Sequence, residues 1–170
     1  MGYVHDSQIA FHIPPTACHF VTGTWSDVAA AVTDTIGKRK AAGDETATLN
    51  IPIFPPFSKA ENKGFYLTSV DIWFDVATAD LEALSAVVNL VTMGADGAAP
   101  TVAAQTFTYD AGHDAAGERV DQDEHKMTLT LTTPIWMDDG EQVLVELTID
   151  AAATSLFTLR GAQANGTLRL

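Results

Sequence analysis

The segment 65–77 reads FYLTSVDIWFDVA, and it decides the fold class. From position 69 to position 76, polar and apolar side chains alternate at every step, with Trp73 as the exception on the polar face. A period of two residues is typical of a β-strand that buries one face and exposes the other. This segment therefore predicts a long strand over one sheet of an all-β protein.

Two further segments, 126–132 and 142–150, show the same alternation. The residues Asp138, Asp139 and Gly140 between them are typical of turns, because aspartate and glycine tolerate unusual backbone angles. The pattern therefore predicts that these two strands pair in an antiparallel hairpin.

Other segments complete the expected architecture. One helical turn is expected at 78–84, with Thr78 as its N-cap and Leu81 and Leu84 turned inward. The segment 25–40 fits a helix and a strand equally well by periodicity. The remaining predicted strands are 45–54, 84–93, 101–109, 155–164 and 166–170. About eight strands without intervening helices predict an antiparallel β-sandwich or barrel.

The chain is strongly acidic. Nine Lys and Arg residues against 22 Asp and Glu residues give its 170 residues a formal net charge of −13. The only basic cluster is Lys38, Arg39 and Lys40, so nucleic acid and anionic membrane surfaces are not expected as partners. The lone Cys18 excludes an internal disulfide and is expected to be a small buried residue.

The acidic segment 110–125 is the main candidate for ion binding. Asp121, Asp123 and Glu124 could supply oxygen ligands to Ca²⁺, although the glycine spacing of an EF-hand is absent. A zinc site at His113 and His125 would lack the usual paired-ligand spacing. The alternative is a solvated acidic loop that holds no ion, so no cofactor is firmly expected.

Catalytic motifs are missing from the sequence. It contains no nucleophile elbow, no P-loop and no dinucleotide-binding glycine motif. Asp71 and Asp75 are about 13 Å apart along one strand, which is too far for either glycosidase geometry, so we expect them to serve solubility. We therefore expect no enzymatic activity and assign no catalytic residue.

The first 22 residues differ from the rest of the chain. They contain Tyr3, Phe11 and the pair Pro14 and Pro15, and we expect residues 1–22 to form an N-terminal arm that packs on a neighbouring subunit. Residues 23–170 are expected to form a single domain. The chain shows no export signal, which predicts synthesis in a cytoplasm.

Three stretches carry a resemblance to a known group of proteins: 63–74 (KGFYLTSVDIWF), 104–110 (AQTFTYD) and 151–155 (AAATS). Through these stretches, the sequence of residues 23–170 resembles small uncharacterised β-sandwich proteins of tailed bacteriophages and of environmental viral sequences. The resemblance implies a jelly-roll-like β-sandwich in a virion, and it favours a strand over a helix at 25–40. It carries no functional residues.

Three functions follow as hypotheses. The first is a structural virion protein, such as a capsid decoration or cement subunit, which forms homo-oligomers (trimers above all) and binds the major capsid protein or another virion component. Its expected contact residues are Tyr3, Phe11 and Trp73. The second is a carbohydrate-binding module that uses Trp25, Trp73 or Trp136 as an aromatic platform. The third is a cupin-like metalloenzyme, which would need converging histidines.

Overall fold

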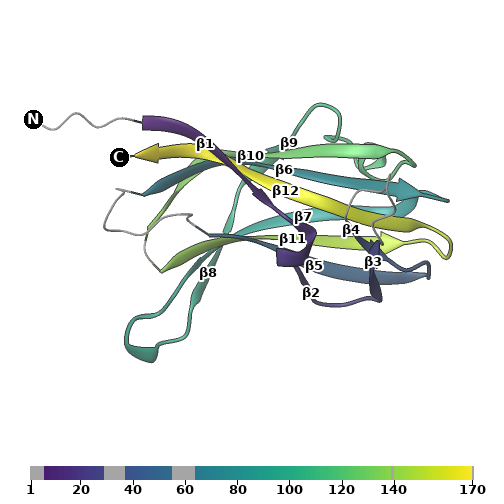
Figure 1. Ribbon diagram of the computed structural model, residues 1–170, viewed down its shortest axis with the longest axis horizontal. Helices are drawn as coiled ribbons and strands as arrows, with labels where there is room; N and C mark the ends of the chain where they lie inside the picture. Colours follow the sequence, from purple (N-terminus) through teal and green to yellow (C-terminus); the bar gives the residue numbers. More distant parts are fainter. Residues whose placement is uncertain (1–5, 29–36, 55–63, 139, 170) are drawn as a thin grey trace, which may run out of the picture.

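In a computed structural model, the chain forms a sandwich of two antiparallel β-sheets (Figure 1). The structure describes residues 6–28, 37–54, 64–138 and 140–169. Sheet A holds β1 (Asp6–Ile13), β3 (Trp25–Val28), β4 (Gly37–Lys40), β6 (Phe65–Ala77), β9 (Phe107–Tyr109), β10 (Glu124–Met137) and β12 (Leu156–Arg169). Sheet B holds β2 (His19–Phe20), β5 (Glu45–Ile53), β7 (Leu81–Thr92), β8 (Thr101–Gln105) and β11 (Glu141–Ala151). Three short 3₁₀ turns join them: η1 (Pro15–Ala17), η2 (Ala95–Gly97) and η3 (Gly117–Arg119).

Eight of these strands have the jelly-roll arrangement. The order is β4-β12-β6-β10 in sheet A and β5-β11-β7-β8 in sheet B, and every pairing is antiparallel. The chain changes sheet at most connections, which is how two Greek keys form. The short strands β2, β3 and β9 extend the sheets, and β1 pairs with β12 beside β4. The expected jelly-roll-like sandwich is thus confirmed, with 12 strands in the described residues instead of about eight.

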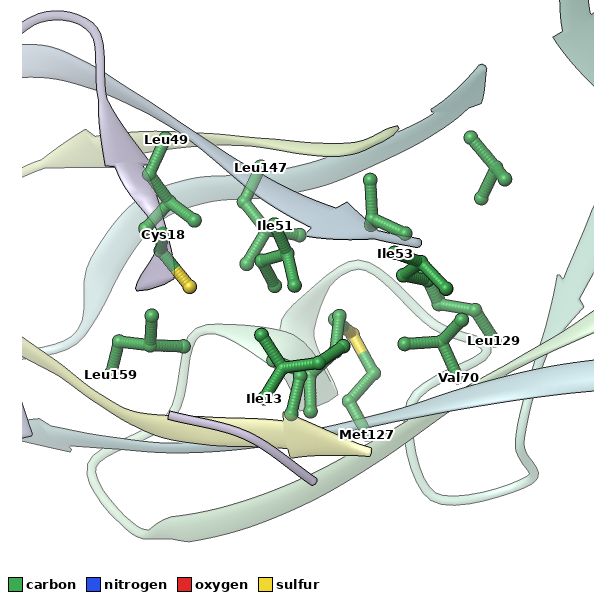
Figure 2. Close-up of a cluster of buried hydrophobic side chains, with 14 of the residues drawn as sticks. Ile13, Cys18, Leu49, Ile51, Ile53, Val70, Met127, Leu129, Leu147 and Leu159 are labelled. Carbon is green, nitrogen blue, oxygen red and sulfur yellow. The ribbon is translucent and has the colours of Figure 1, made fainter. Parts of the chain in front are cut away.

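The core lies between the two sheets and is built from the alternating apolar positions (Figure 2). Ile51 of β5, Leu147 of β11 and Ile72 of β6 have no exposed surface. Each such side chain contributes about 1.5–3 kcal/mol when it leaves water. The continuous inner face explains why the alternating segments fold as strands.

One predicted pairing is wrong. β10 and β11 do not form a hairpin, because β10 pairs with β6 and β9 in sheet A while β11 pairs with β5 and β7 in sheet B. The turn that contains Asp138 and Gly140 instead carries the chain from one sheet to the other. Alternation reports which face of a strand is buried, and it does not report the partner strand.

The local predictions differ from the structure in three places. Thr78 has φ 73° and lies in the β6–β7 turn, so no helical turn forms at 78–84 and Leu81 begins β7. The segment 101–109 divides into β8 and β9, which lie in different sheets. The predicted strands 155–164 and 166–170 are one strand, β12. The ambiguous segment 25–40 contributes β3 and β4, and residues 29–36 between them lie outside the described residues.

The expected N-terminal arm is part of the sandwich over residues 6–20. β1 pairs with β12 from Asp6 opposite Arg169 to Ile13 opposite Ala162. Ile13 and Cys18 are buried in the same core cluster as Leu159 (Figure 2). These residues therefore pack on their own domain, because the outer edge of β12 offers an unfilled hydrogen-bonding ladder. Tyr3 lies outside the described residues.

Candidate functional site

The outer face of sheet A is polar and carries one aromatic side chain near its middle, Trp73. In the register of the sheet, Trp73 lies opposite Lys126 on β10 and opposite Gly161 on β12. The Lys126 ammonium group stands 5.5 Å from the centre of the indole ring, close enough for a cation–π contact. Trp73 is half-buried, so part of its ring is available to a ligand.

Gly161 makes space beside this ring. Its φ is 144°, and the β12 register shifts between Leu159 and Gly161, as in a β-bulge. A Cβ atom on Gly161 would lie 2.8 Å from Cε1 of His12. The imidazole of His12 therefore occupies the volume that a side chain would fill, 6.4 Å from the Trp73 ring centre.

The bulge also directs Arg160 toward Asp75. The guanidinium Nε and Nη2 atoms donate to the two Asp75 carboxylate oxygens at 2.5 and 2.9 Å. Such a two-point contact fixes both side chains in one plane. Both are only partly exposed, so they form a preorganised polar wall.

These side chains border a groove of about 510 Å³. Its lining combines aromatic residues with charged and polar ones: His12, Trp73, Phe74, Asp75, Glu124, His125, Arg160 and Gln163. Beside the groove, Gln163 donates from Nε2 to Oδ1 of Asn165 at 2.8 Å, so its amide is also held in place. A concave site with one aromatic surface and a few fixed polar groups is the usual form of a small-molecule site.

Asp71 does not serve solubility as the sequence suggested. Its side chain is largely buried, accepts a hydrogen bond from Oγ1 of Thr128 at 2.7 Å and lies 3.1 Å from Nζ of Lys126. Asp75 is likewise paired, with Arg160. The neighbouring strands supply these partners, which alternation within β6 could not reveal.

A chain of buried polar groups runs beneath the acidic loop. Nδ1 of His113 lies 2.8 Å from Oδ1 of Asp110, Nε2 of His113 lies 3.2 Å from Nδ1 of His125, and Nε2 of His125 lies 3.0 Å from the Asp121 carbonyl oxygen. The His125 ring stacks on Phe74 at 4.6 Å.

Burial acts to raise the pKa of Asp110, but hydrogen bonds from the Thr128 amide, the His113 ring and the Gly112 amide together lower it. The carboxylate form of Asp110 is therefore favoured.

The acidic loop is held to the body of the protein. Arg119 stacks on the Tyr109 ring at 4.2 Å and donates to the carbonyl oxygens of His113 and Leu84. The hydroxyl oxygen of Tyr109 accepts from the Ala86 amide of sheet B at 3.1 Å. The loop thus bridges the two sheets and is more than a solvated connection.

The three expected Ca²⁺ ligands border one shallow hollow of about 300 Å³, together with His113, Glu118, His125 and Lys126. Asp121 uses its backbone carbonyl for His125, Asp123 accepts from the Glu124 amide at 2.7 Å, and Glu124 borders the groove beside Trp73. Within the described ranges, no three His, Cys, Asp or Glu side chains are placed to hold one metal ion. His113 and His125, the expected zinc ligands, do lie side by side, and their ring nitrogens contact each other at 3.2 Å.

The other expected contact and platform residues have different places. Phe11 packs edge-on against Phe65 at 5.4 Å and is half-buried in its own domain. Trp25 packs on Phe20, and its indole nitrogen donates to the Thr22 carbonyl at 2.7 Å. Trp136 lies near Tyr66 and borders a separate cavity of about 340 Å³.

The basic cluster on β4 is used within the fold. Lys38 pairs with Asp27 at 2.6 Å, and Arg39 donates to Oγ1 of Thr158. Lys40 is fully buried, and its ammonium group donates to the carbonyl oxygens of Ala41 and Gly43, both at 2.9 Å.

Sequence reasoning identified Trp73 and missed His12, Arg160 and Gln163. Those three lie on β1 and β12, which are far from β6 in sequence. One signal was present: an isolated glycine within a strand pattern, such as Gly161, often marks a bulge.

No family model matches the chain, and comparison with curated proteins found no match. Among solved structures, a family two carbohydrate esterase from Cellvibrio japonicus matches with TM-score 0.45 and 12% identity, over 98% of this chain and 36% of the esterase. The protein TmCBM61, in complex with β-1,4-galactotriose, matches with TM-score 0.40 and 9% identity, over 85% of this chain and 83% of that one. The enzymatically active domain of bacteriophage CBA120 tailspike protein 4 matches with TM-score 0.43 and 11% identity, over 95% of this chain and 19% of the tailspike chain.

The chain thus spans well under half of the length of the esterase and of the tailspike domain. Separately, a search of the described residues finds no helix with the length and apolar character that a membrane crossing requires.

Proposed function

We propose that this protein is a carbohydrate-binding β-sandwich module and that the groove beside Trp73 holds an uncharged saccharide. The observation that carries the proposal is the combination of the half-buried Trp73 side chain with the paired Arg160 and Asp75 at the wall of one groove.

The two chemical features of a sugar match these two features of the groove. The C–H groups on one face of a pyranose ring carry slight positive charge and stack on the negative face of an indole ring. Neighbouring hydroxyl groups both donate and accept, so they can bond to the Asp75 and Glu124 carboxylates and to the Arg160 guanidinium. Because these groups are held before binding, little side-chain entropy is lost.

Charge selects against acidic sugars. The groove holds two carboxylates, Asp75 and Glu124, and the Arg160 charge is already paired with one of them. The whole chain has a formal net charge of −13, which repels anions at long range. A neutral oligosaccharide is therefore the ligand class that best fits.

A glycan array followed by calorimetry tests this proposal. We expect binding to at least one neutral oligosaccharide and at least a tenfold loss of affinity in Trp73→Ala, equivalent to about 1.4 kcal/mol or more. Trp136→Ala, the same change outside the groove, is the matched control and should retain affinity. Absence of binding to every saccharide, or equal affinity in Trp73→Ala and the wild type, would contradict the proposal.

A second proposed function is the structural virion role, as a capsid decoration or cement subunit that binds the major capsid protein. It is favoured by exposed apolar side chains that gather at the β7–β8 end of sheet B: Val87, Met93 and Val102. Exposed apolar groups of this kind mark contact surfaces. Cryo-electron microscopy of purified particles should show the subunit on the capsid surface, and particles without it would reject this role.

A further inference from the structure

β8 is an edge strand of sheet B. It pairs with β7 over Val88–Thr92 on one side, and the described residues provide no strand on its other side. Its first four residues are exposed, and Val102 keeps 63% of its surface accessible. Figure 1 shows that the loop joining β7 and β8 extends beyond the other strands. An open edge presents backbone donors and acceptors to a further strand.

The backbone groups on this open edge can be assigned. The Gln105 side-chain amide donates to the Ala103 carbonyl oxygen at 2.9 Å, which places that carbonyl away from β7. Because alternate residues of an antiparallel strand point to opposite edges, Thr101 and Gln105 share this direction. Thr101 and Gln105 therefore offer N–H and C=O groups to a partner, and Ala103 offers its N–H together with a carbonyl oxygen that the Gln105 side chain must share or release.

The edge lacks the features that usually prevent pairing. Residues 97–109 contain no charged side chain, although the chain as a whole is strongly acidic. Natural edge strands are commonly protected by lysine, by an inward charge or by a proline within the strand. In β8, the only proline nearby is Pro100, which precedes the strand.

We infer that β8 pairs with β8 of a second copy of this chain, in an antiparallel arrangement about a two-fold axis near Ala103. The pairing joins two five-stranded sheets into one continuous sheet. This inference is independent of saccharide binding, whereas it uses two of the exposed side chains, Val87 and Val102, that favour the virion role.

Two features favour a second copy as the occupant. An antiparallel strand pair is self-complementary, so the same groups serve both subunits. With Ala103 at the axis, Val102 of each subunit lies opposite Ala104 of the other, and an uncharged edge lets two acidic chains approach without placing like charges opposite each other.

The outer face of sheet B extends the contact. Val102 pairs with Val91 on β7, and Val87 lies on the same face of β7 as Val91, four residues along the strand. A single five-residue strand pair buries less than the 1,200–2,000 Å² of a typical stable interface, so we expect a dimer that dissociates on dilution, roughly in the micromolar range.

Analytical ultracentrifugation from about 1 μM to about 1 mM tests this inference. We expect the wild type to shift from one chain to two as concentration rises. Val102→Lys should remain a single chain throughout, because the two introduced lysines would lie on the same face close to the two-fold axis and repel each other, and the apolar contact with Ala104 would be lost. Val21→Lys introduces the same charge at a valine that is 48% exposed outside β8, and it should dimerise like the wild type.

Hydrogen exchange adds a direct readout. In the concentrated wild type, the amides of Thr101, Ala103 and Gln105 should exchange at least tenfold more slowly than in Val102→Lys. Circular dichroism should show that both lysine variants remain folded.

Three results would overturn the inference. The first is a wild type that stays a single chain at the highest concentration. The second is a trimer, as the sequence led us to expect, whose mass Val102→Lys does not change. The third is equal disruption by Val21→Lys and Val102→Lys.

Discussion

Replacement of Gly161 by alanine should destabilise the fold and disturb the groove together. The φ of 144° is a conformation that glycine adopts readily and other residues do not, at a cost of about 1–3 kcal/mol. The new Cβ would also lie 2.8 Å from Cε1 of His12 and 3.2 Å from the Ile13 carbonyl oxygen. The imidazole can rotate away, but the β1 backbone is held by its pairing with β12. We therefore expect a total loss of about 2–4 kcal/mol of unfolding free energy.

Gly43 provides the control for backbone strain. Its φ is 152°, yet a Cβ atom there would meet no atom within 4 Å. Gly43→Ala should therefore show the conformational cost alone, about 1–3 kcal/mol, and the excess in Gly161→Ala measures the steric contact. His12→Ala combined with Gly161→Ala should recover part of that excess, since the nearest clashing atoms are removed.

Urea denaturation followed by tryptophan fluorescence and circular dichroism measures these differences. Equal losses in Gly161→Ala and Gly43→Ala, with no recovery in the double variant, would refute the proposed packing of His12 over Gly161. The groove geometry derived from that packing would then need revision.

Three further predictions concern single side chains. Lys40→Met should cost about 1–3 kcal/mol, because two partly buried carbonyl oxygens lose their donor, whereas Glu45→Gln at the exposed partner should cost less in the same urea titration. Burial raises the pKa of the Cys18 thiol to about 12, so Cys18 should resist a thiol reagent in the native protein and react once unfolded, and rapid native labelling would contradict this. The lowered pKa of Asp110 stabilises the fold above the unfolded value of about 3.9, and this contribution is lost as the pH falls through the lower folded pKa. Stability measured against pH should therefore fall less steeply in Asp110→Asn below about pH 4, and an unchanged slope would reject the role of this carboxylate.

Much of the secondary structure could be predicted from the sequence. The strand predicted at 65–77 coincides with β6, and 45–54 and 142–150 match β5 and β11 within one residue at each end. These strands bury one face in a continuous core, so the two-residue period is strong. Two predictions were wrong because distant strands decide what a local pattern cannot show. The expected helical turn at 78–84 is a turn that begins at Thr78, and the expected hairpin turn between Asp138 and Gly140 connects two different sheets.

The sequence by itself determined that this protein is an all-β sandwich with an acidic surface and a buried cysteine, since alternation, charge and residue type are properties of neighbouring positions. The tertiary structure alone decided that His12, Trp73 and Arg160 share one groove and that β8 lies at an open edge. Both depend on which strands become neighbours, and strand order is set by packing across the whole sandwich, between residues up to about 150 positions apart in the chain.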